Sequence, residues 1–173
     1  MRIITPHTEL RPLSAKDVSH KYVSWLNNRE INKYLEARFK YHTIAETKSF
    51  VEEMNRNPDI YLFGIFINKQ HVGNVKLGPI DRNHLLANIG LLIGETDYWG
   101  KGVASEVIQA VVTFAFEELG LQKIDAGCYE SNIASKKAFI NAGFEVEGFL
   151  KSHVVSEGKR EGAWLLGITP RAT

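Results

Sequence analysis

A strand, a glycine-rich turn and a long helix follow one another in the chain, and this succession constrains the fold most. Residues 89–93 are almost wholly apolar, which predicts a strand buried on both faces. Residues 94–100 predict a turn, and residues from about 101 to 119 predict a helix that Gly120 caps. One face of this helix is apolar at steps of four, four and three, with Val103, Val107, Val111 and Phe114. The succession indicates an α/β fold.

The rest of the chain alternates between strand and helix patterns, without a linker or an internal repeat. Strands are predicted over residues 10–13, 61–68, 72–80, 85–93, 123–129, 145–155 and 162–168. Helices are predicted over residues 15–26, 44–56, 101–119 and 133–142, with a weaker helical turn over 31–35 and a loop over 36–42. Thr43 and Glu46 form a capping box that opens the second helix. These patterns predict a mixed sheet of about seven strands with about four helices.

Length and composition predict one domain. The chain has 173 residues, of which 44% are hydrophobic and 24% are charged. A chain of this length buries roughly 70% of its unfolded surface, which is enough for a core without disulfides or structural metal. We therefore expect a single domain over residues 1–173.

Charge and cysteine content exclude several classes of partner. Lys and Arg number 21 against 20 Asp and Glu, without a long block of one sign, so a nucleic-acid-binding face is not expected. Cys128 is the single cysteine, which forbids an internal disulfide and suits a reducing compartment. The first residues lack the apolar core of a signal peptide, and no apolar run approaches the ~20 residues that span a bilayer. We expect a cytoplasmic protein without a membrane partner.

The glycines around the start of the long helix predict an anion site. Gly100 and Gly102 let the backbone approach a ligand, and the free N–H groups of the first helical turn favour a phosphate or pyrophosphate. A Walker A loop, typical of a kinase, is excluded because five residues instead of four separate Gly94 from Gly100, and because Gly102 stands where Ser or Thr would bind magnesium. A dinucleotide fingerprint, typical of an oxidoreductase, fails at Ser105, where glycine or alanine is needed.

Three motifs in order carry a resemblance to a known family. Trp99-Gly100-Lys101-Gly102-Val103-Ala104 follows the apolar strand, and Asn132-x-x-Ser135 and Ala142-Gly143-Phe144 follow later. The set resembles the GNAT superfamily of acetyl-coenzyme A-dependent N-acetyltransferases. Within it, the motifs are similar to the Rim-type branch, which acetylates ribosomal-protein N-termini. The resemblance spans residues 10–168 and implies a single-domain GNAT fold with a sheet splayed between the fourth and fifth predicted strands.

The resemblance also implies acetyl-CoA as co-substrate, with no metal. Backbone amides of the glycine turn would hold the pyrophosphate, the end of the apolar strand would bond the pantetheine arm, and the Asn-x-x-Ser motif would meet its other side. The implied cofactor-binding residues are Leu91, Leu92, Ile93, Trp99, Gly100, Lys101, Gly102, Val103, Ala104, Ser105, Asn132 and Ser135. The histidines lack the spacing of metal ligands, which agrees with a metal-free reaction.

The implied reaction is attack of an unprotonated amine on the acetyl carbonyl, with a backbone N–H near Leu92 or Ile93 stabilising the oxyanion. Phe139 replaces the tyrosine that often protonates the leaving thiolate in the family, which leaves Ser135 as the candidate proton donor. A helix-capping role for Ser135 is equally compatible with the sequence. His84 is the candidate base, since histidine is the residue type best suited to exchange a proton near neutral pH. Glu106 is better explained by the helix dipole.

The acceptor amine is expected beside the loop that precedes Thr43. The candidate substrate-binding residues are Asn27, Arg29, Glu36, Tyr41, His42 and Lys76. Aromatic and cationic side chains there suit a nucleotide-linked amino sugar, whereas Glu36 suits a peptide amine. Both acceptors stay open, as does a role for each of these residues as a solvated surface side chain.

A second hypothesis of a different class is a non-catalytic coenzyme A-binding module. It is motivated by Phe139 and by the lack of one obvious base. A homodimer formed through the late hairpin is compatible with the sequence under either hypothesis.

Overall fold

The computed structural model describes residues 1–170, which form an eight-stranded mixed sheet with helices on both faces. The strands are β1 (Ile3–Ile4), β2 (Glu9–Pro12), β3 (Tyr61–Ile67), β4 (Gln70–Asp81), β5 (Leu86–Ile93), β6 (Lys123–Tyr129), β7 (Glu145–Ser156) and β8 (Lys159–Ile168). The helices are α1 (His20–Asn27), α2 (Arg29–Asn32), α3 (Ile44–Arg56), α4 (Val103–Glu117) and α5 (Ile133–Asn141), with 3-10 turns η1 (Ala15–Asp17), η2 (Glu36–Phe39) and η3 (Thr96–Tyr98). The predicted α/β class is confirmed.

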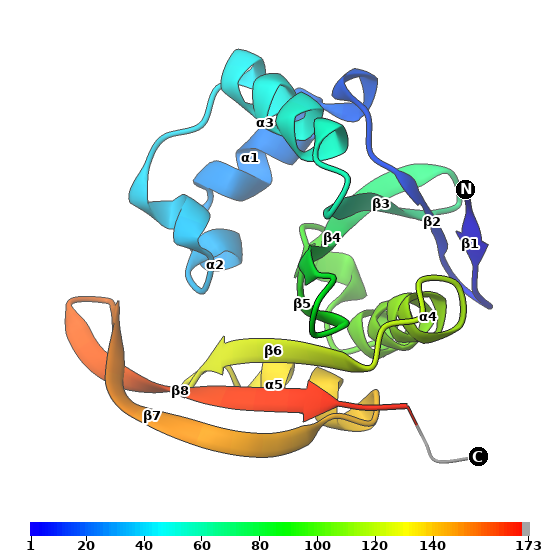
Figure 1. The fold of residues 1–173 in the computed structure, drawn as a ribbon. Helices are drawn as coiled ribbons and strands as arrows, with labels where there is room; N and C mark the ends of the chain where they lie inside the picture. Colours follow the sequence, from blue (N-terminus) through cyan, green and yellow to red (C-terminus); the bar gives the residue numbers. More distant parts are fainter. Residues whose placement is uncertain (171–173) are drawn as a thin grey trace.

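The sheet is divided in the middle. Its strand order is β1-β2-β3-β4-β5-β6-β8-β7, and β5 and β6 form its parallel pair. Pairing of these two strands is confined to residues 86–88 against residues 123–125. Beyond them the strands diverge, as Figure 1 shows. This is the predicted splay between the fourth and fifth strands of the sequence pattern, and it is confirmed.

Two buried clusters cover the two faces of the sheet. The larger one packs α4 and α5 against the strands, with Val107, Val111 and Phe139 among its members. The smaller one packs α1 and α3 against the other face, around Trp25 and Val51. Each helix therefore buries one apolar stripe, as the helical spacing predicts.

The prediction that residues 89–93 are buried on both faces is wrong. Ile89 is buried, but Leu91, Leu92 and Ile93 are each partly exposed. The reason is the divided sheet, because this end of β5 pairs with β4 while β6 has already turned away. An apolar run predicts that its side chains avoid water, but it does not say what covers them. Here part of the run lines a cleft instead of packing against another element.

The first predicted helix is in fact two short elements. Residues 15–17 form η1, and α1 begins at His20 after a second cap, in which Ser19 accepts a hydrogen bond from the Tyr22 amide at 3.2 Å. The break occurs because the Asp17 carboxylate accepts from the Ser14 amide at 2.8 Å and from Arg11 at 2.6 Å. These bonds close one turn and leave the next residue extended.

The remaining differences are small elements that pattern analysis overlooked. The structure adds the two-residue strand β1, the short helix α2 in place of the predicted turn at 31–35, and η2 within the predicted loop. The eight strands and five helices of residues 1–170 therefore exceed the expected seven and four. Each addition is too short to leave a periodic signal.

Local signals located the other elements well. The capping box of Thr43 and Glu46 opens α3, and Asn132 caps α5 by accepting from the Ser135 amide at 3.2 Å. The hairpins β3–β4 and β7–β8 both form. Their turns are tighter than predicted, with positive φ at Asn68, Lys69, Glu157 and Gly158.

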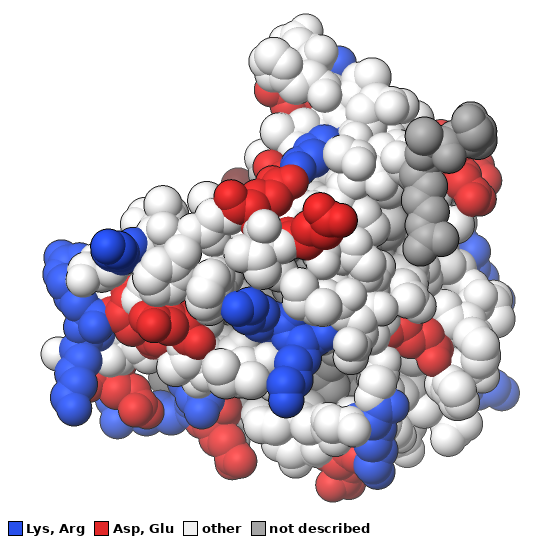
Figure 2. All heavy atoms as spheres, turned by 90° about the horizontal axis from the view of Figure 1, so that it is seen from below, with Lys and Arg blue, Asp and Glu red and all other residues white. Residues whose placement is uncertain are grey.

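The surface carries both signs of charge. Figure 2 shows Lys and Arg interspersed with Asp and Glu on the face seen from below. Among the helices of residues 1–170, none is long and apolar enough to cross a membrane.

Replacement of Asp17 by asparagine is expected to destabilise the protein in a pH-dependent way. Burial alone would raise the pKa of Asp17, but hydrogen bonds from Arg11 and Ser14 outweigh it and lower that pKa from 3.8 to about 2. The stabilisation is therefore complete above pH 3.8 and declines as the pH falls towards 2. We expect Asp17→Asn to lower the free energy of unfolding by about 1 kcal/mol at pH 7 after allowance for solvent screening, and by less at pH 3.

Urea denaturation at both pH values measures this difference. Glu53→Gln, on the exposed side of α3, is the matched control and is expected to change little. An equal loss for Asp17→Asn at pH 7 and pH 3 would contradict the proposed ion pair.

Candidate active site

A cleft of about 820 Å³ opens where β5 parts from β6. One wall comes from β4 and β5, with Asn74, Lys76, Asn88, Gly90, Leu91 and Leu92. The opposite wall comes from β6 and α5, with Gly127, Cys128, Tyr129, Asn132, Ser135 and Phe139. The segment from α1 to α3 adds Glu36 and His42. The sheet therefore exposes the edge of β5 to a cavity at the point where a neighbouring strand is missing.

The turn after β5 is held firmly in place by its neighbours. The Trp25 indole packs so closely on Gly94 that any side chain there would collide with it. The same indole donates to the Glu95 carboxylate at 2.9 Å, and Lys21 forms an ion pair with Glu95 at 2.8 Å. On the other side, the Trp99 indole donates to the Ile93 carbonyl at 2.8 Å.

The start of α4 presents unpaired backbone donors. Gly100 and Gly102 have φ of 69° and 81°, and a Cβ built on either would find open space within 4 Å. The first helical hydrogen bond of α4 runs from the Glu106 amide to the Gly102 carbonyl, at 3.1 Å. The amides of Val103 and Ala104 therefore lack intrahelical partners and point out of the helix start. This is the geometry of an anion site.

The predicted cofactor residues around this turn differ in solvent exposure. Trp99, Gly100, Lys101 and Gly102 are exposed, whereas Ala104 and Ser105 are partly buried. The Val103 side chain is 6% exposed and belongs to the core, so only its amide can serve a ligand.

Glu106 has a structural partner set. Its carboxylate accepts hydrogen bonds from the Thr5 hydroxyl and from the His7 amide, and it lies 2.7 Å from His7 Nδ1. Burial alone would raise the pKa of Glu106, but these hydrogen bonds outweigh it and lower that pKa. The residue therefore fastens the N-terminal segment to α4.

The start of α5 forms the far side of the cleft. Asn132 and Ser135 both line it, and within residues 1–170 no hydrogen bond engages the Ser135 hydroxyl. Phe139 lies one helical turn further, is 2% exposed and packs against Phe144 with ring centroids 5.0 Å apart. Burial raises the pKa of the nearby Cys128 thiol, which favours its neutral form.

A hydrogen-bonded chain joins the two sides of the cleft, and sequence analysis missed part of it. The Tyr129 hydroxyl donates to Glu36 at 2.8 Å and accepts from Arg38 at 2.8 Å. Arg38 also donates to the Leu35 and Val155 carbonyls, each at 2.8 Å. Burial and the Glu36 contact raise the pKa of Tyr129, so its hydroxyl stays a donor.

The candidate substrate residues fall into two neighbouring cavities. Glu36, His42 and Lys76 line the cleft, whereas Asn27, Arg29 and Tyr41 line a second pocket beside it. Asn27 and His42 also hold each other, because the Asn27 side chain donates to the His42 carbonyl at 2.9 Å and accepts from its amide at 2.8 Å. The His42 ring lies 2.7 Å from the Ala37 carbonyl, which gives it a structural partner.

The structure does not bring His84 to the cleft. His84 lies in the exposed turn before β5, where its amide donates to Asp81 at 3.0 Å. On β5 the lining of the cleft comprises Asn88, Gly90, Leu91 and Leu92, and His84 is not part of it. His84 therefore lacks the position that a base for this cleft requires, and we do not propose it further.

A polar pair on β4, His71 and Asn74, lies beside the cleft, and sequence analysis did not predict that these two residues contact each other. His71 is surrounded by the rings of Tyr22, Trp25 and Phe66, and its Nε2 lies 2.8 Å from Asn74 Oδ1. Asn74 is 7% exposed and lines the cleft, and its Nδ2 has no hydrogen-bond partner within residues 1–170. Over the same residues, no cluster of three or more His, Cys, Asp or Glu could hold a metal ion.

Comparison with known proteins places this geometry in a family. A family model described as an acetyltransferase (GNAT) domain matches residues 7–145. The probable N-acetyltransferase YjcK of Bacillus subtilis (strain 168) is 30% identical over 167 residues, which cover 92% of each chain.

Two solved structures share the fold over nearly the whole chain. Spermidine N-acetyltransferase from Vibrio cholerae, in complex with CoA and spermine, has a TM-score of 0.85 at 23% identity and covers 95% of this chain and 96% of its own. RimL, a ribosomal L7/L12 alpha-N-protein acetyltransferase in complex with coenzyme A, has a TM-score of 0.85 at 19% identity and covers 98% of both chains.

The divided sheet and the glycine turn thus define a coenzyme A-dependent acyltransferase fold. The chain belongs to the GNAT acetyltransferase family. It is an N-acetyltransferase, and acetyl-CoA is its acetyl donor. The resemblance to the GNAT superfamily deduced from the motifs is confirmed. The open space at Gly100 and Gly102 fits a pyrophosphate that contacts the backbone.

A matched pair of substitutions at Gly102 tests this anion site. Asparagine and aspartate have nearly the same shape and both tolerate positive φ, but only aspartate adds a negative charge. We expect Gly102→Asp to weaken coenzyme A binding at least about tenfold relative to Gly102→Asn, because a carboxylate would face the pyrophosphate.

Calorimetric titration with coenzyme A measures the two affinities, and circular dichroism verifies that both variants fold. Equal affinities for the two variants would show that the pyrophosphate lies elsewhere.

Proposed function

We propose that the enzyme transfers the acetyl group directly from acetyl-CoA to the primary amine of a small molecule or of a chain terminus. One observation carries the proposal: the cleft reaches Leu91 and Leu92, and β5 leads from them directly into the glycine turn. A donor bound at the turn and along β5 would therefore present its thioester inside the cleft.

The donor would be held mainly by backbone. Amides of residues 100–104 would bind the pyrophosphate, and the free edge of β5 over residues 91–93 would bond the pantetheine arm as a strand would. Asn132 and Ser135 would contact the arm from the other side. The donor supplies an activated acetyl carbonyl, and an amide near Leu92 or Ile93 would stabilise the charge that develops on its oxygen.

Ser135 is the proposed proton donor to the departing thiolate. Phe139 has no proton to give, and the Ser135 hydroxyl lines the cleft without a hydrogen-bond partner in residues 1–170. The hydroxyl would act directly or through a water molecule. The capping role at α5 belongs to Asn132, because its side chain accepts from the Ser135 amide, which leaves the serine hydroxyl free.

Glu36 is the proposed site of the acceptor amine. Tyr129 fixes one carboxylate oxygen, and the side chain stays 79% exposed, so an ammonium can reach it. An α-amine has a pKa near 7.7 to 8.0 and is partly neutral at pH 7, whereas a lysine amine near 10.4 is about 0.1% neutral. A terminal amine therefore needs less help from a base, and Glu36 with solvent would take its proton.

Two acceptor classes fit the cleft. Lys76 on β4 would suit the phosphates of a nucleotide-linked amino sugar, and Glu36 would suit a peptide amine. A homodimer through the β7–β8 hairpin, a cytoplasmic location and a single domain over residues 1–173 stay predictions. The hypothesis of a non-catalytic coenzyme A-binding module is disfavoured by the relatives named N-acetyltransferases.

An acceptor panel tests the proposed function. Purified enzyme with acetyl-CoA is expected to release thiol and to add one acetyl group to at least one of UDP- and TDP-amino sugars, N-terminal peptides, polyamines and aminoglycosides. Thiol release and product mass are measured together, so that thioester hydrolysis is recognised. Absence of both with every amine would contradict the proposal, even where calorimetry detects acetyl-CoA binding.

Substitutions of Ser135 separate its two roles. We expect Ser135→Ala to lower kcat at least about tenfold. Thermal stability is expected to change little, because the backbone amide of residue 135 still donates to the capping side chain of Asn132. Ser135→Thr keeps a hydroxyl and is expected to retain most of the activity. Equal kcat values for the alanine variant and the wild type would remove Ser135 from the mechanism.

A further inference from the structure

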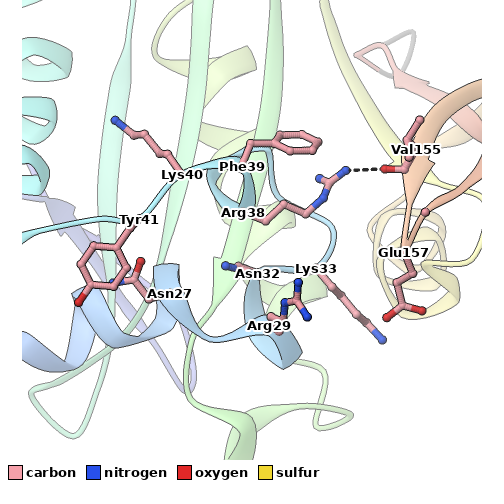
Figure 3. A pocket seen from close by; sticks show the side chains of 11 residues that line it. Asn27, Arg29, Asn32, Lys33, Arg38, Phe39, Lys40, Tyr41, Val155 and Glu157 are labelled. Atoms are coloured by element: carbon pink, nitrogen blue, oxygen red, sulfur yellow. Dashed lines mark hydrogen bonds between the residues drawn. The ribbon is translucent and has the colours of Figure 1, made fainter.

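A second pocket lies beside the cleft, and cationic side chains dominate it. This side pocket has a volume of about 840 Å³ and is lined by α1, α2, the η2 segment and the tip of the β7–β8 hairpin. Figure 3 shows Arg29, Asn32 and Lys33 together on and just after α2, with the Lys33 side chain extending towards Glu157 of the hairpin. With Arg38 and Lys40, four cations stand against the single carboxylate of Glu157.

Three of these cations have no acidic partner. Within residues 1–170, Arg29, Lys33 and Lys40 form no ion pair, and all three are exposed. Arg38 is different, since its guanidinium donates to the Val155 carbonyl and holds the hairpin against η2. Arg29 and Lys33 lie one helical turn apart and repel each other, and an anion bound beside them would relieve that repulsion, whereas the Lys40 side chain points away from them in Figure 3.

Asn32 gives a second and independent sign of a ligand. Its side chain is 4% exposed and lines the side pocket. Its Nδ2 donates to the Leu26 carbonyl at 2.6 Å, but its Oδ1 accepts no hydrogen bond within residues 1–170. A buried acceptor without a donor is costly, and a ligand hydroxyl that reached this oxygen from the side pocket would remove that cost.

An aromatic face completes the pocket. Tyr41 is 76% exposed and lies beside Asn27 in Figure 3. Phe39 is 68% exposed, but the Arg38 guanidinium lies over one face of its ring, 4.1 Å from the ring centroid, in a cation–π contact. Tyr41 therefore offers a free ring on which a flat base can stack.

We propose that the side pocket binds the phosphate and base of a nucleotide, as the unreactive end of a nucleotide-linked acceptor. Arg29 and Lys33 would bind the phosphate, Asn32 Oδ1 and Glu157 would accept from sugar hydroxyls, and Tyr41 would stack on the base. Lys40 lines both cavities, so a molecule anchored here can extend its amine into the cleft. The inference rests on the proposed function and narrows its acceptor to this class.

The test measures nucleotide binding with the donor site already filled. Calorimetric titration of UMP and AMP into coenzyme A-saturated protein prevents these probes from occupying the donor site. We expect saturable binding that Arg29→Gln combined with Lys33→Gln weakens about tenfold or more. Arg56→Gln combined with Lys48→Gln removes two exposed cations from α3 and is expected to leave binding unchanged. Coenzyme A affinity is expected to be equal in all three proteins.

Comparison of nucleotides with inorganic pyrophosphate separates the contacts to the base from those to the phosphate. Tyr41→Ala is expected to weaken binding of UMP and AMP while binding of inorganic pyrophosphate stays the same. No saturable nucleotide binding by the wild type, or equal binding by wild type and the Arg29 and Lys33 double variant, would overturn the proposal. Neither result would affect acetylation of other amines in the acceptor panel, so failure of the side pocket and failure of the proposed function are distinguishable.

Discussion

The short parallel pairing of β5 and β6 is the constraint on which the rest of the structure depends. With only residues 86–88 of β5 paired to β6, the later part of β5 keeps an edge without a strand neighbour in the middle of a sheet. Buried backbone groups require partners, so a ladder that stops inside a protein needs a ligand to continue it. The pantetheine arm carries amides that can do so. The same divergence leaves the start of α4 open to a phosphate.

The parts of the fold that sequence predicted best are those settled by neighbours in the chain. Thr43 with Glu46, and Asn132 with the Ser135 amide, satisfy helix starts within three residues, so spacing alone reveals them. The start of α1 was missed because Ser14 and Ser19 are both suitable caps. The choice between them depends on contacts of Asp17 with Arg11, which lies on another element.

In the candidate site, too, features set by neighbouring residues in the chain are predictable, and features set by contacts between distant residues are not. The donor side is predictable because Gly100 and Gly102 adopt positive φ, which few other residues tolerate. The acceptor side is not, since Tyr129 and Glu36 are 93 positions apart and neither has a local signal of its partner. His84 illustrates the opposite error, because a suitable side chain on a predicted turn says nothing about which end of the strand carries the cleft.

Glu106 links two regions that seem unrelated. Its carboxylate accepts hydrogen bonds from Thr5 and His7, while the amides of the same helical turn are the proposed binding site of the donor's pyrophosphate. If a donor binds preferentially to the ordered form of this helical turn, thermodynamic linkage requires that it also disfavour opening of the segment that contains Thr5 and His7. Amide hydrogen exchange at β1 and β2, at the outer edge of the sheet, is therefore coupled to occupancy of a donor site in its centre.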